Sequence, residues 1–170
     1  MMRSNNTESH LLSLDVRRRK VGFVVVDGSS HVLDFGIKRC NSSGAGLAAE
    51  VRDRIKDLLS IFCPRTMLIR VTQTRLADKD RRISTILKVL REEAGMRSVL
   101  VRDLQRQTIK KAFIAKGLRS KPEIASWLGS QFPELAWKPL RARKPWQSEP
   151  YQTSVYDAAA TAAVHLGRVK

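Results

Sequence analysis

The sequence of 170 residues is poor in cysteine, with only Cys40 and Cys63, and these form no CxxC pair. Such spacing predicts buried or free thiols and argues against a disulfide framework or a cysteine-bound metal. No apolar run approaches the length of a membrane span. The first nine residues are polar and lack the apolar core of a signal peptide, so we expect a frayed, disordered N-terminal tail on a soluble, cytoplasmic protein.

Acidic residues are also scarce. The chain has 16 Asp and Glu against 32 Lys and Arg, which gives a formal net charge of +16. Such an excess concerns the partner rather than the fold, and the usual partner of a strongly basic domain is a polyphosphate. No segment pairs a basic face with Trp, Phe and Leu on the other, so a membrane surface is the weaker candidate. The composition favours nucleic acid.

One stretch near the N-terminus, residues 10–16, organises the chain. It reads HLLSLDV, which is too apolar for a surface strand, and we expect a central strand covered on both faces. Its one acid, Asp15, lies at the carboxyl end, where open α/β sheets place ligand sites. Asp15 could equally end the strand and bond turn amides. The length fits one domain over 10–170.

The order of predicted elements indicates an α/β fold with a mixed five-stranded sheet flanked by helices. Three strands, 11–16, 20–26 and 32–38, form an antiparallel meander, with one face of the third carrying Leu33, Phe35 and Ile37. A fourth strand, entering after a helix, is expected to run parallel to the first. The other expected elements are strands at 67–71 and 98–102, helices at 47–62, 80–93 (closed by Gly95), 104–114, 122–128 (capped by Ser120) and 154–168, and an irregular loop at 131–150.

These features resemble the RuvC-type Holliday-junction resolvases of the RNase H-like superfamily. The similar motifs are Leu14-Asp15, residues 21–27 (VGFVVVD) and 33–36 (LDFG), the run 109–112 (IKKA) with Gly117 and Lys121, and Asp157-Ala158-Ala159. Each motif is short, and their agreement in order and spacing carries the resemblance. The resemblance implies an RNase H-like fold, a DNA partner and a possible homodimer.

The resemblance also implies Mg²⁺-dependent hydrolysis of a phosphodiester, the reaction of an endodeoxyribonuclease. That chemistry needs several carboxylates, because two divalent ions roughly 4 Å apart hold the attacking and leaving oxygens. Asp15 and Asp157 match two of the family's four catalytic and metal-binding acids, whereas Arg70 and Ala160 stand where the other two are expected. Glu149 could move into the site, or it could be a solvated loop acid.

The family's basic segment is better preserved. The resemblance places Lys110 and Lys121 near one end of the sheet, where they would contact phosphates without reading sequence. Lys111 and Arg119 belong to the same basic run, although lysines often lie on solvated helix faces. Trp146, like Trp137, stands among cations and could stack on unpaired bases or cover the core beneath the long loop.

Three functions follow as hypotheses. The chain could be a nucleic-acid-binding protein for branched or structured DNA with a degraded metal site. It could be an active Mg²⁺-dependent endonuclease or junction resolvase that uses Asp15, Asp157 and Glu149, or a basic RNA-binding or interaction module. The missing acids favour the first hypothesis over the second. Two close carboxylates need positive charge, so we predict that Arg70 pairs with Asp15 and is shared with Asp157.

Overall fold

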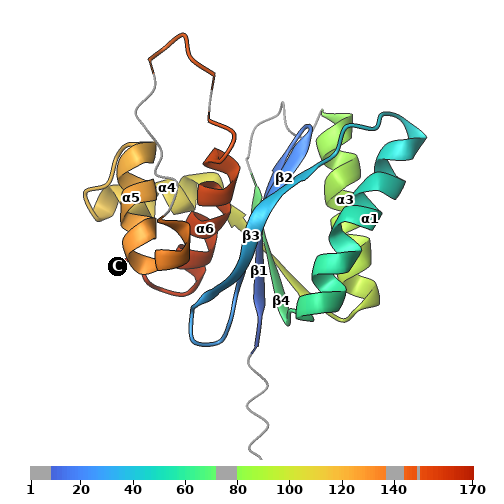
Figure 1. Ribbon diagram of the computed structural model, residues 1–170, viewed down its shortest axis with the longest axis horizontal. Helices are drawn as coiled ribbons and strands as arrows, with labels where there is room; N and C mark the ends of the chain where they lie inside the picture. The colour runs from blue at the N-terminus through green and yellow to red at the C-terminus, as the bar shows by residue number, and fades with distance from the viewer. Residues whose placement is uncertain (1–8, 72–79, 137–143, 149) are drawn as a thin grey trace, which may run out of the picture.

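The computed structural model describes residues 9–71, 80–136, 144–148 and 150–170. Its centre is one five-stranded sheet in the order β3-β2-β1-β4-β5 (Figure 1). The strands are β1 (Leu11–Arg17), β2 (Lys20–Val26), β3 (Val32–Arg39), β4 (Thr66–Val71) and β5 (Leu100–Gln105). The first three strands pair antiparallel, β4 is parallel to β1, and β5 is parallel to β4. The predicted mixed sheet with a central first strand is confirmed.

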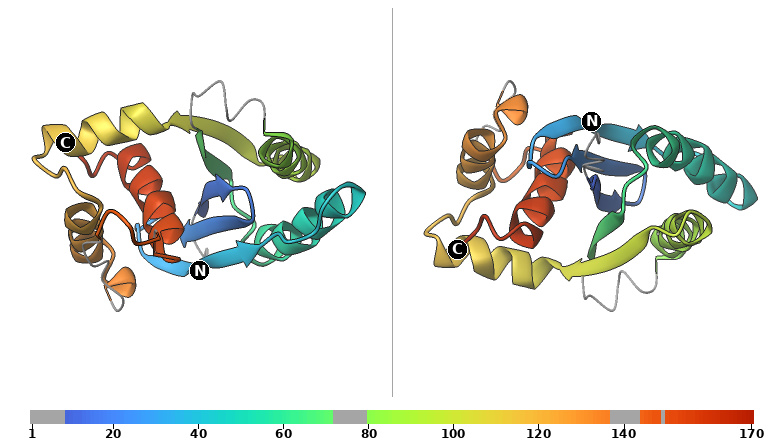
Figure 2. Two further views of the ribbon diagram at one scale, coloured as in Figure 1. Left: turned by 90° about the horizontal axis from the view of Figure 1, so that it is seen from above. Right: turned by 90° about the horizontal axis from the view of Figure 1, so that it is seen from below.

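Helices cover both faces of the sheet, as Figures 1 and 2 show. One face packs against α1 (Ala45–Phe62) and α3 (Arg81–Met96). The other packs against α6 (Thr153–His165), with α4 (Arg106–Ala115), α5 (Lys121–Gln131) and the 3₁₀ turn η1 (Pro133–Leu135) beyond it. In the described part of the chain, no helix combines the length and the apolar character needed to cross a bilayer.

The alternation of side chains along β1 decides which residues reach which face. Leu12 and Leu14 enter the core under α1 and α3, whereas Leu11 enters the core under α6. Ser13 also faces α6, because its hydroxyl donates a 2.7 Å hydrogen bond to the carbonyl oxygen of Ala158. Since strand side chains alternate with a period of two, Asp15 lies on this same face.

Helix α6 lies very close to the sheet, as its run of alanines predicts. Gly22 of β2 lies opposite Asp15 in the strand register, and a Cβ atom built there would lie 2.4 Å from the carbonyl oxygen of Ser154. No side chain fits between the sheet and the start of α6 at this point. The absence of a side chain at Gly22 therefore lets α6 bring its acid, Asp157, over the end of β1.

We expect Gly22→Ala to lower the free energy of unfolding by about 2 kcal/mol, because the new methyl group meets backbone that cannot easily move. Urea denaturation measures the change. The matched control is Gly95→Ala, inside α3, where an added Cβ meets no atom within 4 Å. That control should stabilise the protein by up to about 1 kcal/mol, the helix preference of alanine over glycine. Equal stability of the two variants would contradict the close approach of α6.

Several predicted boundaries were wrong around the fifth strand. Gly95 does not close the second long helix, since α3 continues to Met96. A tight turn then uses the next residues, with Ser98 in the left-handed region at φ 55°. Strand β5 therefore begins at Leu100 and not at Ser98, in register with β4 from Thr66 onward. It also includes Leu104, which was predicted to open the following helix.

Two further expectations need correction. A bulge between β2 and β3 pairs Val26 with Val32, so Val32 is buried with Phe35 and Ile37 while Leu33 is left 44% exposed. The last helix ends at His165, three residues earlier than expected. A loop was predicted over 131–150, but its first residues are helical: Gln131 ends α5, and η1 follows at Pro133–Leu135. Of the tail predicted over 1–9, residues 1–8 lie outside the described residues.

Candidate nucleic-acid interface

The ends of two central strands place an acid and a cation side by side. Asp15 of β1 lies opposite Arg70 of β4 in the parallel register. Leu68, two residues before Arg70, is buried in the core under α6, so Arg70 points to that same face. Asp157 approaches both residues from the middle of α6. The three charged side chains thus come from elements that are far apart in sequence.

Two guanidinium groups bridge the two acids. Arg70 Nη1 lies 2.8 Å from Asp15 Oδ1 and 3.3 Å from Asp157 Oδ2. Arg17 Nε lies 2.7 Å from Asp15 Oδ2, and Arg17 Nη2 lies 2.6 Å from Asp157 Oδ2. The predicted pair between Arg70 and Asp15, shared with Asp157, is therefore present. Arg17 reaches the two carboxylates with two different nitrogens of its planar guanidinium, whereas Arg70 contacts both with the same nitrogen, Nη1.

This acid pair (Asp15 and Asp157) is largely shielded from water. The side chain of Asp15 is 3% exposed and that of Asp157 is 15% exposed. Burial raises the pKa of the Asp157 carboxyl above its usual range; the charge of Arg70 acts against this rise, and the charge of Asp15 adds to it. The positive charges of Arg70, Lys121 and Arg17 favour the ionised form of Asp157.

Two of these contacts were not predicted. The expected first strand ended at residue 16 and left Arg17 out, whereas β1 runs to Arg17, and residues two apart in a strand share a face. Lys121, predicted to bind phosphate, has its Nζ 3.6 Å from Asp157 Oδ2. Three cations thus contact two acids, which leaves a positive charge in excess.

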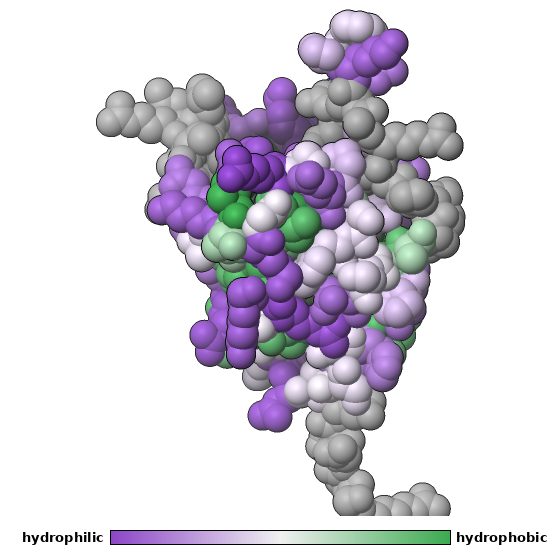
Figure 3. Space-filling model, turned by 90° about the vertical axis from the view of Figure 1, so that its left-hand side faces the viewer, coloured by the Kyte–Doolittle hydropathy of each residue, from purple (hydrophilic) through white to green (hydrophobic). Residues whose placement is uncertain are grey.

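A cavity of about 240 Å³ opens beside the acid pair, between α4, α5 and α6. Its cationic residues, which we call the rim, are Arg70, Arg106, Lys110, Arg119 and Lys121, and its other lining residues are Ile109, Phe113, Ile124, Thr153, Tyr156, Asp157 and Ala160. On the side of the molecule that carries α4 and α5, an apolar patch is bordered by hydrophilic side chains (Figure 3). The cavity suits an anion with an apolar part.

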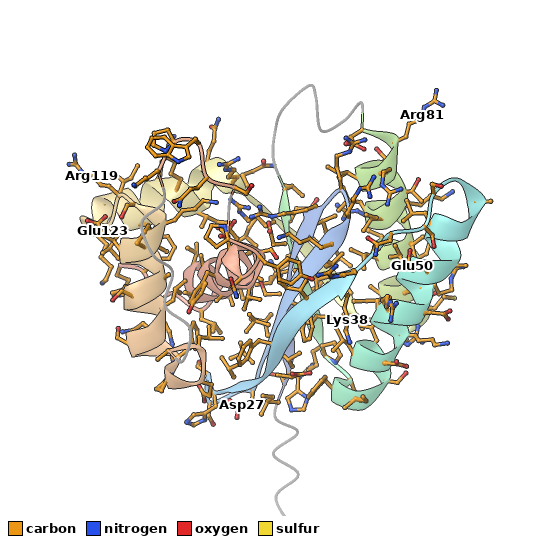
Figure 4. The ribbon with its side chains drawn as sticks, turned by 45° about the horizontal axis from the view of Figure 1, so that its top comes forward. Asp27, Lys38, Glu50, Arg81, Arg119 and Glu123 are labelled. Atoms are coloured by element: carbon orange, nitrogen blue, oxygen red, sulfur yellow. The ribbon has the colours of Figure 1, made fainter. Side chains whose placement is uncertain are left out.

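Three of the four basic residues predicted to bind phosphate lie around the cavity. Lys110, Lys121 and Arg119 line the cavity, whereas Lys111 is exposed on α4 outside the lining. The residues around Arg119 are ordered by a capping box, in which Ser120 and Glu123 bond each other's backbone amides, so the predicted Ser120 cap is confirmed. Figure 4 shows Arg119 and Glu123 at this corner, far from Asp27 in the turn after β2.

The remaining candidates lie elsewhere. Trp146 is 77% exposed, does not line the cavity, and has Lys144 Nζ 5.3 Å from its ring centre. Glu149 and Trp137 fall outside the described residues. Asp27 accepts hydrogen bonds from the amides of Ser29 and His31 and so belongs to the turn after β2.

The Mg²⁺ implied by the resemblance can be tested against these side chains. Mg²⁺ needs an octahedral shell of oxygen ligands, supplied by carboxylates and waters. Over the described ranges, no group of three or more His, Cys, Asp or Glu side chains converges to hold a metal. Both oxygens of Asp15, and Asp157 Oδ2, already lie against guanidinium groups. The described residues therefore do not fit a divalent cation, and they fit an anion better.

Solved structures share this architecture. T. thermophilus RuvC in complex with a Holliday junction substrate matches with a TM-score of 0.72 at 17% identity, over 93% of each chain. The fold is RNase H-like, as in RuvC. A second Thermus thermophilus RuvC structure matches with a TM-score of 0.68 at 17% identity, over 95% of this chain and 98% of that one. The yeast mitochondrial Holliday junction resolvase Ydc2 matches with a TM-score of 0.62 at 12% identity. This match covers 92% of this chain and 78% of Ydc2.

No family model and no curated protein matches the sequence. At these identities the likeness to RuvC and Ydc2 shows the RNase H-like fold alone. Within that fold, Asp15 lies near the end of the central strand and Arg70 lies on the neighbouring parallel strand. Asp157 approaches both from α6. The site's chemistry must be argued from these side chains.

Proposed function

We propose that this protein is a RuvC-like nucleic-acid-binding protein that recognises branched DNA and does not cleave it with a metal. The bridging of Asp15 and Asp157 by Arg17 and Arg70 carries the proposal. In this arrangement the guanidinium groups do the electrostatic work that divalent ions would otherwise do, since they neutralise two buried carboxylates. The rim carries further cations, Arg106, Lys110 and Arg119, that can contact phosphate groups.

The charge distribution supports binding through the nucleic-acid backbone. The net charge is +16, and five cationic side chains line one cavity. Lysine and arginine contacts to phosphates hold a duplex in register without reading its sequence. The solved RuvC complex contains a Holliday junction substrate, so a four-way junction is the first ligand to test.

The decisive experiment compares ligands and scores two outcomes. Purified protein is mixed with a four-way DNA junction, duplex DNA, single-stranded DNA and an RNA hairpin, in Mg²⁺ or Mn²⁺ and in EDTA. We expect junction binding that is unchanged by EDTA, and no cleavage in any lane. Metal-dependent cleavage would refute the proposal and favour the nuclease, in which case Glu149→Gln tests that acid. Tighter binding of the RNA hairpin than of the junction would favour the RNA-binding module.

Binding should depend steeply on salt, because phosphate contacts release counterions from DNA. We expect the logarithm of the junction affinity to fall linearly with the logarithm of the salt concentration. Replacing both Lys110 and Lys121 by Ala should flatten that slope by about two, one unit for each lost phosphate contact. Fluorescence anisotropy at several salt concentrations measures the slope.

A matched control removes two lysines from the opposite face of the sheet. Lys56 and Lys88 lie on α1 and α3, each beside an acid of its own helix. Their double replacement by Ala lowers the net charge equally but should leave the slope within experimental error. Equal slopes for the two double variants would show that the charge acts diffusely and not through the cavity.

A further inference from the structure

The cavity beside the acid pair has an apolar wall that phosphate binding alone does not explain. Ile109, Phe113, Ile124, Tyr156 and Ala160 line it together with the cationic rim. Phosphate oxygens take hydrogen bonds and positive charge, and they gain nothing from aliphatic or aromatic surface. A ligand that fits both parts carries an anionic group joined to a flat or apolar one.

A buried hydroxyl in the same wall points to a ligand with a polar edge. Thr153, in the first turn of α6, is 1% exposed and lines the cavity. Its Oγ1 is itself buried and has no hydrogen-bond partner among the described residues, so a ligand in the cavity meets this hydroxyl when the threonine side chain rotates toward it. An unpaired hydroxyl in such a place is unfavourable, so a ligand atom that bonds it would be bound selectively.

We propose that this cavity receives one unpaired nucleotide of the bound DNA. The base lies against the apolar wall, its polar edge bonds the Thr153 hydroxyl, and its phosphate is held by Lys110 and Lys121 on the rim. This inference rests on the proposed function and names the part of the substrate that the site takes. Bases that leave a stack are commonly held between aromatic and apolar side chains and read along one edge.

The dimensions agree with a single base. At about 240 Å³, the cavity is smaller than the pockets that enclose drug-sized ligands. The rim lies next to the acid pair, at the carboxyl ends of β1 and β4, so a strand that follows the rim brings successive nucleotides past the opening. Branched DNA offers unpaired or weakly paired bases at little cost in free energy.

The test uses duplexes with a one-nucleotide bulge that is either a normal base or an abasic site. These two ligands carry the same phosphates, so their affinities differ only through the base. We expect the wild-type protein to prefer the base-containing bulge on the order of tenfold, the usual scale for one buried, stacked base. Thr153→Val, which keeps the shape and removes the hydroxyl, should reduce the preference about threefold.

The matched control is Ser154→Ala. Ser154 is also fully buried with an unpartnered Oγ in the described structure, but it does not line the cavity. This variant should keep the wild-type preference. Ala160→Leu fills the cavity without changing charge and should abolish the preference while leaving the salt slope intact, with circular dichroism checking that it folds.

The outcomes separate this inference from the proposed function. Equal affinity for the two bulges, with a steep salt slope, overturns the nucleotide cavity and leaves DNA binding standing. No binding of either bulge or of the junction overturns both. A free mononucleotide that competes as tightly as the bulged duplex would overturn the assignment of the cavity to a nucleotide within a strand.

Discussion

Replacing Arg70 by methionine should lower the free energy of unfolding by about 3 kcal/mol. The methionine roughly fills the space but leaves Asp15 and Asp157 with one fewer counter-charge in a site where both are largely buried. Breaking one partner out of a buried ion pair is costly because the remaining charge has lost its water as well as its partner. Arg17 and Lys121 still contact the acids, which keeps the loss from being larger.

The control for Arg70 is an exposed arginine with an equally short pair. Arg91 lies 2.8 Å from Asp103, and both side chains are about two-fifths exposed. Arg91→Met should cost less than about 1 kcal/mol, since solvent screens surface pairs. Denaturant unfolding of the two variants makes the comparison. If Arg70→Met loses no more stability than Arg91→Met, the acids do not depend on Arg70.

A double variant tests whether the loss comes from uncompensated charge. Adding Asp15→Asn to Arg70→Met removes one of the acids together with its cation. We expect the double variant to regain most of the lost stability, because a neutral amide at this position needs no counter-charge. Equal or greater loss in the double variant would indicate that shape and packing at Arg70 matter more than its charge.

The second large effect is a gain of metal binding when acids replace Arg70 and Ala160 and a neutral side chain replaces Arg17. The site lacks acids at Arg70 and at Ala160, which lies one helical turn after Asp157 and lines the cavity. Changing only these two is insufficient, because Arg17 also holds both existing acids. The informative variant is therefore Arg17→Gln with Arg70→Glu and Ala160→Asp, which gathers four carboxylates.

We expect calorimetry to detect Mn²⁺ or Mg²⁺ binding by this triple variant and none by the wild type. Four carboxylates repel one another without a metal, so the variant's melting temperature should rise with Mn²⁺ while the wild type's does not. A ligand at 100 times its Kd stabilises the folded state by about 2.7 kcal/mol. The control, Arg17→Gln with Arg70→Gln and Ala160→Asn, adds similar side chains without acids and should bind metal far more weakly, because it holds two carboxylates and not four. Tight Mg²⁺ binding by the wild type would refute the proposed function.

Some features of this site follow from short-range sequence pattern. The apolar run before Asp15 predicts a buried central strand because a strand covered on both faces has no polar alternation. The alanines after Asp157 predict close packing of the last helix. Arg17 was within reach of the same reasoning, since residues two apart in a strand share a face. These inferences need only the periods of helices and strands.

Other features depend on contacts between distant segments. The start of β5 at Leu100 is decided by its pairing with Thr66 of β4 and by the turn that follows α3. The bulge at Leu33 is likewise a matter of how β3 pairs with β2. Strand alternation alone does not locate such a bulge, because the extra residue lies on one strand only and is defined by the partner strand beside it.

The sequence by itself determined the charge excess, the order of strands and helices, and the absence of acids at positions 70 and 160. Only the tertiary structure decided that Arg17 and Arg70 both contact Asp15 and Asp157, and that Lys121 lies beside Asp157. That convergence requires the parallel register of β1 with β4 and the close approach of α6 over Gly22. The physical reason is that ion pairs form only between side chains a few ångströms apart. Which side chains come that close depends on which backbone segments lie side by side, and a local sequence pattern does not show this.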